Sequence, residues 1–354
     1  MTAGLRRNEL FFILAALATT IGAGVWTIGV GASAGSFALS AVALAGVAWV
    51  VSFATEQLGE RLGPEATGLM QSTLGNLPEF FVVLFALREG QILVATTSII
   101  GSIFANALLV LGLAIMVGAW RSPGKVMKFS ARLPSDTATL LLLAVFLIVV
   151  IGVATQDHDP AAAHARGISI VGAITMLIVY GLWVMSYLRG NAQSDPVRHT
   201  PPRLSLGLSL ALLAVAGVGA AFVSEWFVKG LEPAIDAYGI SEAFAGLVVV
   251  AIAGNAIENA VGVVLAAKGE ADLAISVIKN SVSQIAVFLF PLLVLVSQFF
   301  DTPLSFAMAP IYIAALALTA IVVWQVTGDG EAAVWEGAAL IAFYVILATV
   351  ALYE

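Results

Sequence analysis

The stretch GNLPE at residues Gly75–Glu79 recurs as GNAIE at Gly254–Glu258, 179 positions further along the chain. Each copy lies in an apolar segment long enough to cross a lipid bilayer as a helix. A carboxylate at membrane depth is costly and usually lines the path of an ion or substrate. Two such carboxylates, at equivalent positions in two halves of one chain, predict a single cation site built by an internal repeat.

The composition predicts an integral membrane protein. Of the 354 residues, 60% are hydrophobic and 10% are charged, whereas a soluble domain is about one quarter charged. The net charge of -7 includes no basic cluster, so we expect a lipid bilayer and no nucleic acid as partner. The absence of cysteine, and three histidines confined to polar segments, leave no thiolate or imidazole ligand at membrane depth. We expect no bound cofactor, and the oligomeric state stays open.

Hydropathy predicts eleven transmembrane helices. Their expected ranges are 10–31, 36–55, 66–87, 92–118, 137–155, 167–188, 205–228, 243–267, 273–299, 305–326 and 332–353. The segments between these spans fall alternately on the two sides of the membrane. Eleven of the fifteen Lys and Arg residues fall on the side of the N-terminus and three on the other side, with Lys279 inside a span. The positive-inside rule therefore predicts a cytoplasmic N-terminus, with Glu354 on the opposite side of an inner (plasma) membrane.

The same alignment predicts the domain organisation. Residues 1–35 form a leading transmembrane helix, 36–188 a first five-helix repeat, 189–203 a polar cytoplasmic linker, and 204–354 a second five-helix repeat. Because five is an odd number, the second repeat must be inverted relative to the first. The predicted fold is an all-α integral membrane protein with one leading helix and two inverted repeats, an arrangement typical of secondary transporters.

The two repeated acids are the first candidate ligands. Glu79 and Glu258 could be protonated acids that hydrogen-bond between helices, but their recurrence at equivalent positions favours a pair of ligands for a hard cation such as Ca²⁺. Gly75 and Gly254 allow close helix approach or local unwinding. Pro78 cannot donate a backbone hydrogen bond, and carbonyl groups freed at such a break can bind a cation.

Polar neighbours extend the candidate site. Asn76 and Asn255 each precede an acid by three residues, which places amide and carboxylate on one helix face. The next span of each half adds Ser102 and Asn106 in the first half, and Ser281 and Gln284 in the second. The two asparagines before the acids either bind the cation or hold the carboxylates in place, and the side chains of the next spans either bind the cation or hydrogen-bond between helices. Lys279 could pair with Glu258, act as a built-in cation, or extend to the cytoplasmic surface.

These motifs resemble the cation/calcium exchanger superfamily, and in particular its calcium/proton exchanger branch. The residues that carry the resemblance are Gly75–Glu79, 86–91 (ALREGQ), 101–103 (GSI), Ser224, Glu225, Gly254–Glu258, Lys268 and Pro291. The resemblance implies an antiporter that exchanges Ca²⁺ for H⁺, with both ions sharing Glu79 and Glu258. The family usually has His after the second glutamate and Gly-Ser-Ser in the following span. Here Asn259 and an Asn280-Ser281-Val282 sequence preceded by Lys279 stand instead, so Asn259 and Lys279 are candidate modulators.

Other functions remain open at this point. The nearest alternatives on the same scaffold are a Na⁺- or K⁺-coupled calcium exchanger and a proton antiporter for another divalent cation. A cation channel is the alternative of a different class, and it would conduct without proton coupling. The expected spans contain no paired Asp, Ser-His or metal-histidine arrangement, so no enzyme is expected.

Overall fold

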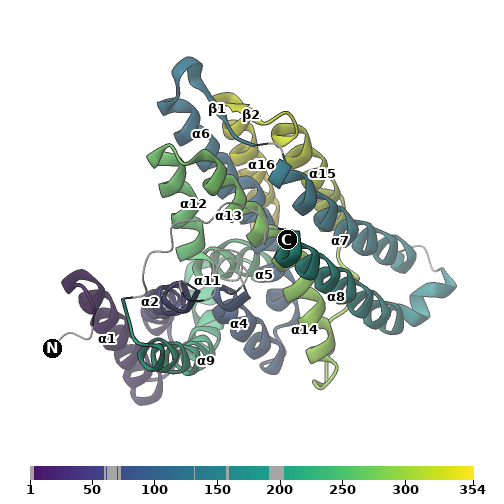
Figure 1. Cartoon of the computed structure of the whole chain (residues 1–354). Coiled ribbons are helices and arrows are strands. Elements are labelled where there is room, and N and C mark those ends of the chain that lie inside the picture. The colour runs from purple at the N-terminus through teal and green to yellow at the C-terminus, as the bar shows by residue number, and fades with distance from the viewer. Residues whose placement is uncertain are drawn as a thin grey trace. The chain divides into compact units, whose positions relative to one another are not determined.

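Helices form nearly all the regular structure of the protein (Figure 1), which the computed structural model describes for residues 4–59, 61, 70, 73–130, 132–156, 159–190 and 203–354. The helices before the 191–202 segment are α1 (Arg7–Gly29), α2 (Ala34–Gly59), α4 (Leu77–Arg88), α5 (Ile92–Phe104), α6 (Leu111–Arg121), α7 (Arg132–Gln156) and α8 (Ala165–Gly190). The helices after that segment are α9 (Leu206–Tyr238), α10 (Glu242–Phe244), α11 (Ala251–Gly254), α12 (Ala256–Lys268), α13 (Ala271–Gln284), α14 (Phe290–Ser297), α15 (Pro310–Thr327) and α16 (Val334–Leu352).

Short irregular elements join some of these helices. Three π-helical segments, η1 (Ala105–Val110), η5 (Ala245–Val250) and η6 (Ile285–Leu289), continue directly from α-helices, and η2 (Pro123–Lys125) and η3 (Pro160–His164) are 3₁₀ turns. Strands β1 (Val126–Lys128) and β2 (Glu331–Ala333) pair antiparallel, with Met127 opposite Ala332.

The prediction of an all-helical integral membrane protein is confirmed. Eight helices of the described part are long and apolar enough to cross a bilayer, and the bent pair Glu242–Gly254 and Ala256–Lys268 raises the number to nine. The predicted spans 66–87 and 137–155 correspond to α4, of twelve residues, and to the shorter apolar stretch Thr139–Ala154 within α7, so neither enters that number. Parts of the 66–87 span, and the linker between 191 and 202, lie outside the described residues.

The helix α9 continues well beyond its predicted end at residue 228. It runs to Tyr238 and stops where Gly239 adopts a left-handed conformation, with φ 64°. Its last turns carry Glu232 and Asp236, so their hydropathy falls although the backbone stays helical. Hydropathy marks the apolar part of a helix, whereas a glycine C-cap marks the helix end.

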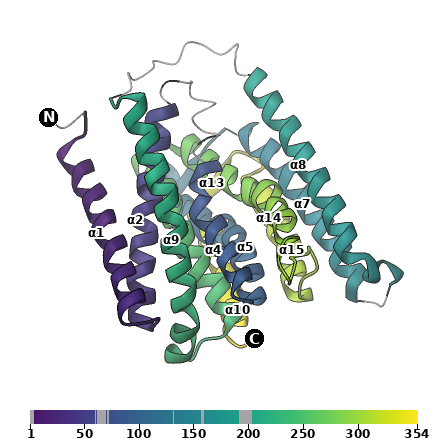
Figure 2. The same cartoon turned by 90° about the horizontal axis from the view of Figure 1, so that it is seen from below.

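The chain divides into two compact units, each containing segments of both predicted repeats. The first unit comprises residues 1–89, 181–240 and 253–257. Within it α2 packs against α1 and α9, and α4 packs on α9 (Figure 2). The rings of Phe37 and Phe227 stack with 4.7 Å between centroids. A Cβ atom on Gly230 would lie 3.0 Å from the Cα atom of Phe37, so glycine allows the close approach of α2 and α9.

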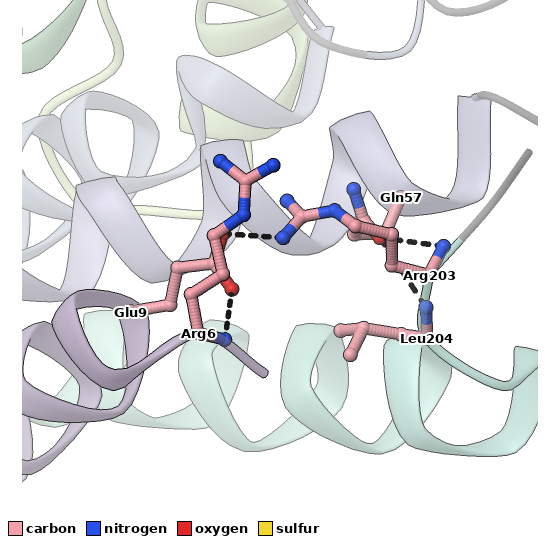
Figure 3. Close-up of polar contacts among 5 residues, drawn as sticks. All are labelled: Arg6, Glu9, Gln57, Arg203 and Leu204. Atoms are coloured by element: carbon pink, nitrogen blue, oxygen red, sulfur yellow. Dashed lines mark hydrogen bonds and ion pairs between the residues drawn. The ribbon is translucent and has the colours of Figure 1, made fainter. Parts of the chain in front are cut away.

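A polar cluster ties three helix ends of this first unit together (Figure 3). Arg203, just before α9, forms a 2.8 Å ion pair with Glu9, which also accepts the Arg6 backbone N–H at 2.7 Å. The side-chain oxygen of Gln57, near the end of α2, accepts the backbone N–H groups of Arg203 and Leu204 at 3.3 and 3.4 Å. The Arg6 N–H is one of the donors that the start of α1 leaves open, and Glu9 satisfies it.

The second unit comprises residues 90–180, 241–252 and 258–354. Its most buried spans are Ile92–Arg121 and Ala271–Ser297. Where α5 crosses η5, a Cβ atom on Gly101 would lie 2.3 Å from the carbonyl oxygen of Leu247, and one on Gly246 would lie 2.0 Å from Thr97 Oγ1. The two backbones approach this closely because glycine stands at both positions.

At one end of this unit, contacts join three loops. The β1–β2 pairing connects the segment after α6 with the segment before α16, near the labels of both strands in Figure 1. Arg121, the last residue of α6, donates to the carbonyl oxygen of Ala267 near the end of α12, and the Ser130 N–H donates to the Asp272 carboxylate. The sequence predicts all three loops on the cytoplasmic side.

Candidate functional site

In both signature stretches the helix is interrupted at the asparagine. A helical turn covers 73–75, Asn76 is a turn residue, and α4 begins at Leu77. In the second copy α11 ends at Gly254, Asn255 is a turn residue, and α12 begins at Ala256 with a 64° bend. Pro78 suits the first turn of α4, where its missing N–H would be unsatisfied in any case. The second copy breaks without proline, so the shared Gly-Asn pair accompanies both breaks.

In the first unit, the break brings residues of both copies together. The side chains of Asn76 and Glu79 are buried, with Glu79 2% exposed. The backbone of Gly254 lies beside Glu79, since a Cβ atom on Gly254 would be 3.7 Å from the Glu79 Cβ. Asn255, also buried, follows directly. Ser224 on α9 donates to the Pro78 carbonyl oxygen at 3.3 Å and holds the start of α4 in place. Gly75 lies at the same break and is half-buried.

In the second unit, Glu258 lies in the first turn of α12 and is half-buried. Ser281 on α13 donates a hydrogen bond of 2.8 Å to the Glu258 carboxylate. The side-chain oxygens of Gln284 and Asn259 are buried and accept no hydrogen bond within the described part of the chain. Oxygen atoms of this kind are available to a hard cation.

The first-half partners Ser102 and Asn106 are both buried. The Asn106 amide donates to the Ser102 carbonyl oxygen at 3.0 Å, so at least its nitrogen serves the helix itself. Asn106 lies in the π-helical segment η1, and Gln284 directly precedes η6. The 179-residue shift places η1 on residues 284–289, where η6 lies. Sequence reasoning missed these π-helical segments, which frequently occur at functional sites.

The Lys279 side chain lies on a different face of α13 from Ser281. It is 5% exposed, and its Nζ donates to Thr327 Oγ1 at 2.7 Å, at the last residue of α15. Among the alternatives for Lys279, this contact favours a side chain directed to one end of the span over a pair with Glu258. Sequence reasoning missed Thr327, because nothing in its own span marks it as a partner.

Comparison with known proteins decides the family. The family model described as "Sodium/calcium exchanger protein" matches residues 32–188 and 208–353. The chain belongs to this family. It is 31% identical over 348 residues to a Ca²⁺/H⁺ antiporter (ChaA) of Bacillus subtilis, covering 96% of this chain and 98% of that protein. It is 30% identical over 331 residues to a Ca²⁺/H⁺ antiporter of Synechocystis, covering 88% and 89%.

A solved structure has the same fold. The native structure of YfkE matches with a TM-score of 0.81 at 27% identity, covering 97% of this chain and 100% of that one. These matches place this exchanger-family protein in the calcium/proton branch of the cation/calcium exchanger superfamily and confirm the predicted resemblance. The relatives are transporters, so the expectation that the protein is not an enzyme is confirmed as well.

The candidate site residues offer oxygen atoms as possible ligands. Among the residues that the structure describes, no group of three or more His, Cys, Asp and Glu could hold a metal ion. Within each unit, the candidate residues offer carboxylate, amide and hydroxyl oxygens instead. Calcium accepts six to eight such ligands in flexible geometry.

Proposed function

We propose that the protein is a secondary transporter that exchanges Ca²⁺ for H⁺ through one site lined by Glu79 and Glu258. The observation that carries the proposal is the repeated helix break, one turn before a carboxylate in each half. The backbone of Gly254 beside Glu79 supports a site that draws on both copies. The names of the relatives support Ca²⁺ and H⁺ as the transported ions.

Coupling follows from competition for the same oxygens. A proton and a calcium ion cannot occupy one carboxylate oxygen together, so binding of either displaces the other. With neither calcium nor protons bound, the site would carry two negative charges through a closed, dry intermediate, and burying charge without a compensating cation is strongly unfavourable. The site therefore passes between the two sides with either calcium or protons bound. That restriction makes transport an exchange instead of a leak.

The proposed architecture has eleven spans: the leading helix in 1–35 and inverted repeats at 36–188 and 204–354, joined by the 189–203 linker. Support comes from the two breaks at Asn76 and Asn255 and from the equivalent π-helical segments η1 and η6. Alternating access then arises as the two halves exchange conformations around the shared site.

Transport in proteoliposomes tests the proposed function. With the purified protein and ⁴⁵Ca²⁺ outside, an acidic lumen should drive uptake, and a protonophore that removes the pH gradient should stop it. Gradients of Na⁺ or K⁺, set separately at equal pH, should drive none. Protein-free liposomes provide the background.

Two other outcomes would contradict this proposal. Uptake driven by a Na⁺ or K⁺ gradient without proton movement would identify the coupled calcium exchanger. Uptake that follows the membrane potential, again without proton movement, would identify a channel.

A further inference from the structure

Lys279 carries an ammonium group that is buried within a span, and this group is hydrogen-bonded to a threonine of another helix. Its Nζ lies 2.7 Å from Thr327 Oγ1, and that hydroxyl lies 2.7 Å from the Val323 carbonyl oxygen. A threonine hydroxyl has one proton to donate. Because it donates that proton to Val323, its lone pairs accept from Lys279. The chain from ammonium to hydroxyl to carbonyl is thus fully directional and fixes α13 to the end of α15.

The opposite face of α13 contacts the candidate site. Ser281 Oγ donates to the Glu258 carboxylate at 2.8 Å. Lys279 and Ser281 are two positions apart and therefore point to different sides of the helix. Ser283, four positions from Lys279, lies on the Lys279 side, and both residues line one small cavity of about 10 Å³. One helix is therefore hydrogen-bonded to α15 through Lys279 and to α12 through Ser281, all within the second unit.

The first half of the chain lacks this attachment. The 179-residue shift carries Ser281 onto Ser102 but Lys279 onto Ile100, which is fully buried on α5. An apolar residue therefore fits the equivalent position, and the scaffold does not require a charge there. A lysine inside a span is costly, so its presence in one half alone indicates a task particular to α13.

We propose that Lys279 is a positioning residue: by binding Thr327 it fixes the rotation and height of α13, and thereby sets Ser281 against the Glu258 carboxylate. The proposal rests on the proposed function, since Glu258 is there a cation ligand. Outer-shell partners that orient a ligand typically change metal affinity about 10–100-fold when removed. Loss of the Lys279–Thr327 bond should act on calcium binding through the same Ser281 contact.

The test is a double-mutant cycle on the KM for Ca²⁺ in proton-driven uptake. Lys279→Met and Ser281→Ala should each raise KM about tenfold, at the lower end for outer-shell partners. The double variant should match Ser281→Ala alone, because the first change acts through the second residue. Thr327→Val should raise KM as much as Lys279→Met does. Thr327→Ser keeps the hydroxyl and should therefore keep the wild-type KM. Lys128→Met, at an exposed lysine, is the matched control and should change nothing.

Two results of this cycle would overturn the proposal. If the KM increases of the two single variants multiply in the double variant, Lys279 acts independently of Ser281. If Lys279→Met lowers KM, the ammonium group acts as a counter-ion that competes with calcium. Should Lys279→Met fail to fold, the Thr327→Val and Thr327→Ser pair decides by the same criterion. Wild-type protein without proton-driven uptake would refute the proposed function, and calcium affinity measured by equilibrium ⁴⁵Ca²⁺ binding would then complete the same cycle for Lys279.

Discussion

Glu79 and Glu258 occupy equivalent positions in sequence but different surroundings. Glu79 is 2% exposed beside the Gly254 backbone, whereas Glu258 is half-buried and accepts a hydrogen bond from Ser281. We predict that Glu79→Gln and Glu258→Gln each lower proton-driven ⁴⁵Ca²⁺ uptake more than about 100-fold, since a lost ligand should cost more than an outer-shell partner. A neutral amide carries no negative charge for the cation and takes up no proton when the cation leaves, so it cannot bind the two ions in turn.

The control for these two variants is a carboxylate outside the site. Glu331 is exposed and faces Lys128 at 3.7 Å, so Glu331→Gln should retain uptake, as exposed ion pairs contribute little. All three proteins should elute alike in size-exclusion chromatography, which shows that the loss is not misfolding. Near-normal uptake by either site variant would remove that glutamate from the mechanism.

Individual site residues differ in how far the sequence could reveal them. The repeated Gly-Asn pair and its acid were visible because the same letters recur 179 positions apart. The role of Lys279 was not, because its partner Thr327 belongs to another span and its direction depends on packing. The unsatisfied oxygen of Asn259 was likewise hidden, since an amide in a membrane helix carries no sign of what surrounds it.

At the scale of elements, hydropathy located the helices and glycine decided how closely they approach. The predicted span 92–118 became a helical run from Ile92 to Arg121, and 332–353 became Val334–Leu352. Gly254 allowed local unwinding, but the 64° bend at Asn255 and the π-helical segments could not be predicted, because a bend or a bulge leaves the hydropathy of a span unchanged. Close crossings, such as that of α5 with η5, depend on which glycines face each other in space.

That crossing gives a stability prediction. A Cβ atom on Gly101 would lie 2.3 Å from the Leu247 carbonyl oxygen, and backbone cannot move aside as a flexible side chain can. Gly101→Ala should therefore destabilise the protein by about 1–3 kcal/mol, the usual cost of overpacking, and lower its unfolding temperature in detergent.

Gly181→Ala is the matched comparison within a helix. No atom lies within 4 Å of a Cβ at Gly181, and alanine favours helix over glycine by about 1 kcal/mol. Its unfolding temperature should stay equal or rise. An unchanged unfolding temperature for Gly101→Ala would show that α5 and η5 do not cross this closely.

At the scale of the whole molecule, the arginines and lysines predict an orientation, and the contacts group segments at the two ends of the second unit in the way that the alternation of spans requires. In the second unit, the loops joined by β1–β2, Arg121 and Asp272 are all predicted on the cytoplasmic side. In the same unit, Ser241 donates to the Ala351 carbonyl oxygen and Tyr312 to the Glu354 carboxylate. Ser241 and Glu354 are predicted on the opposite side, and Tyr312 and Ala351 in the ends of their spans that face that side. These contacts group the segments by the end of the unit that they share.

The absence of cysteine allows that orientation to be measured directly. Single cysteines at the exposed positions Asp301, Asp329 and Tyr238 would each be the one thiol in the chain. Because the spans alternate and positive charge stays inside, a membrane-impermeant maleimide added to intact cells should label Asp301→Cys and Tyr238→Cys. It should label Asp329→Cys only after the membrane is permeabilised. The reverse pattern would place the N-terminus outside, and equal labelling of Asp301→Cys and Asp329→Cys would mean that α15 does not cross the membrane.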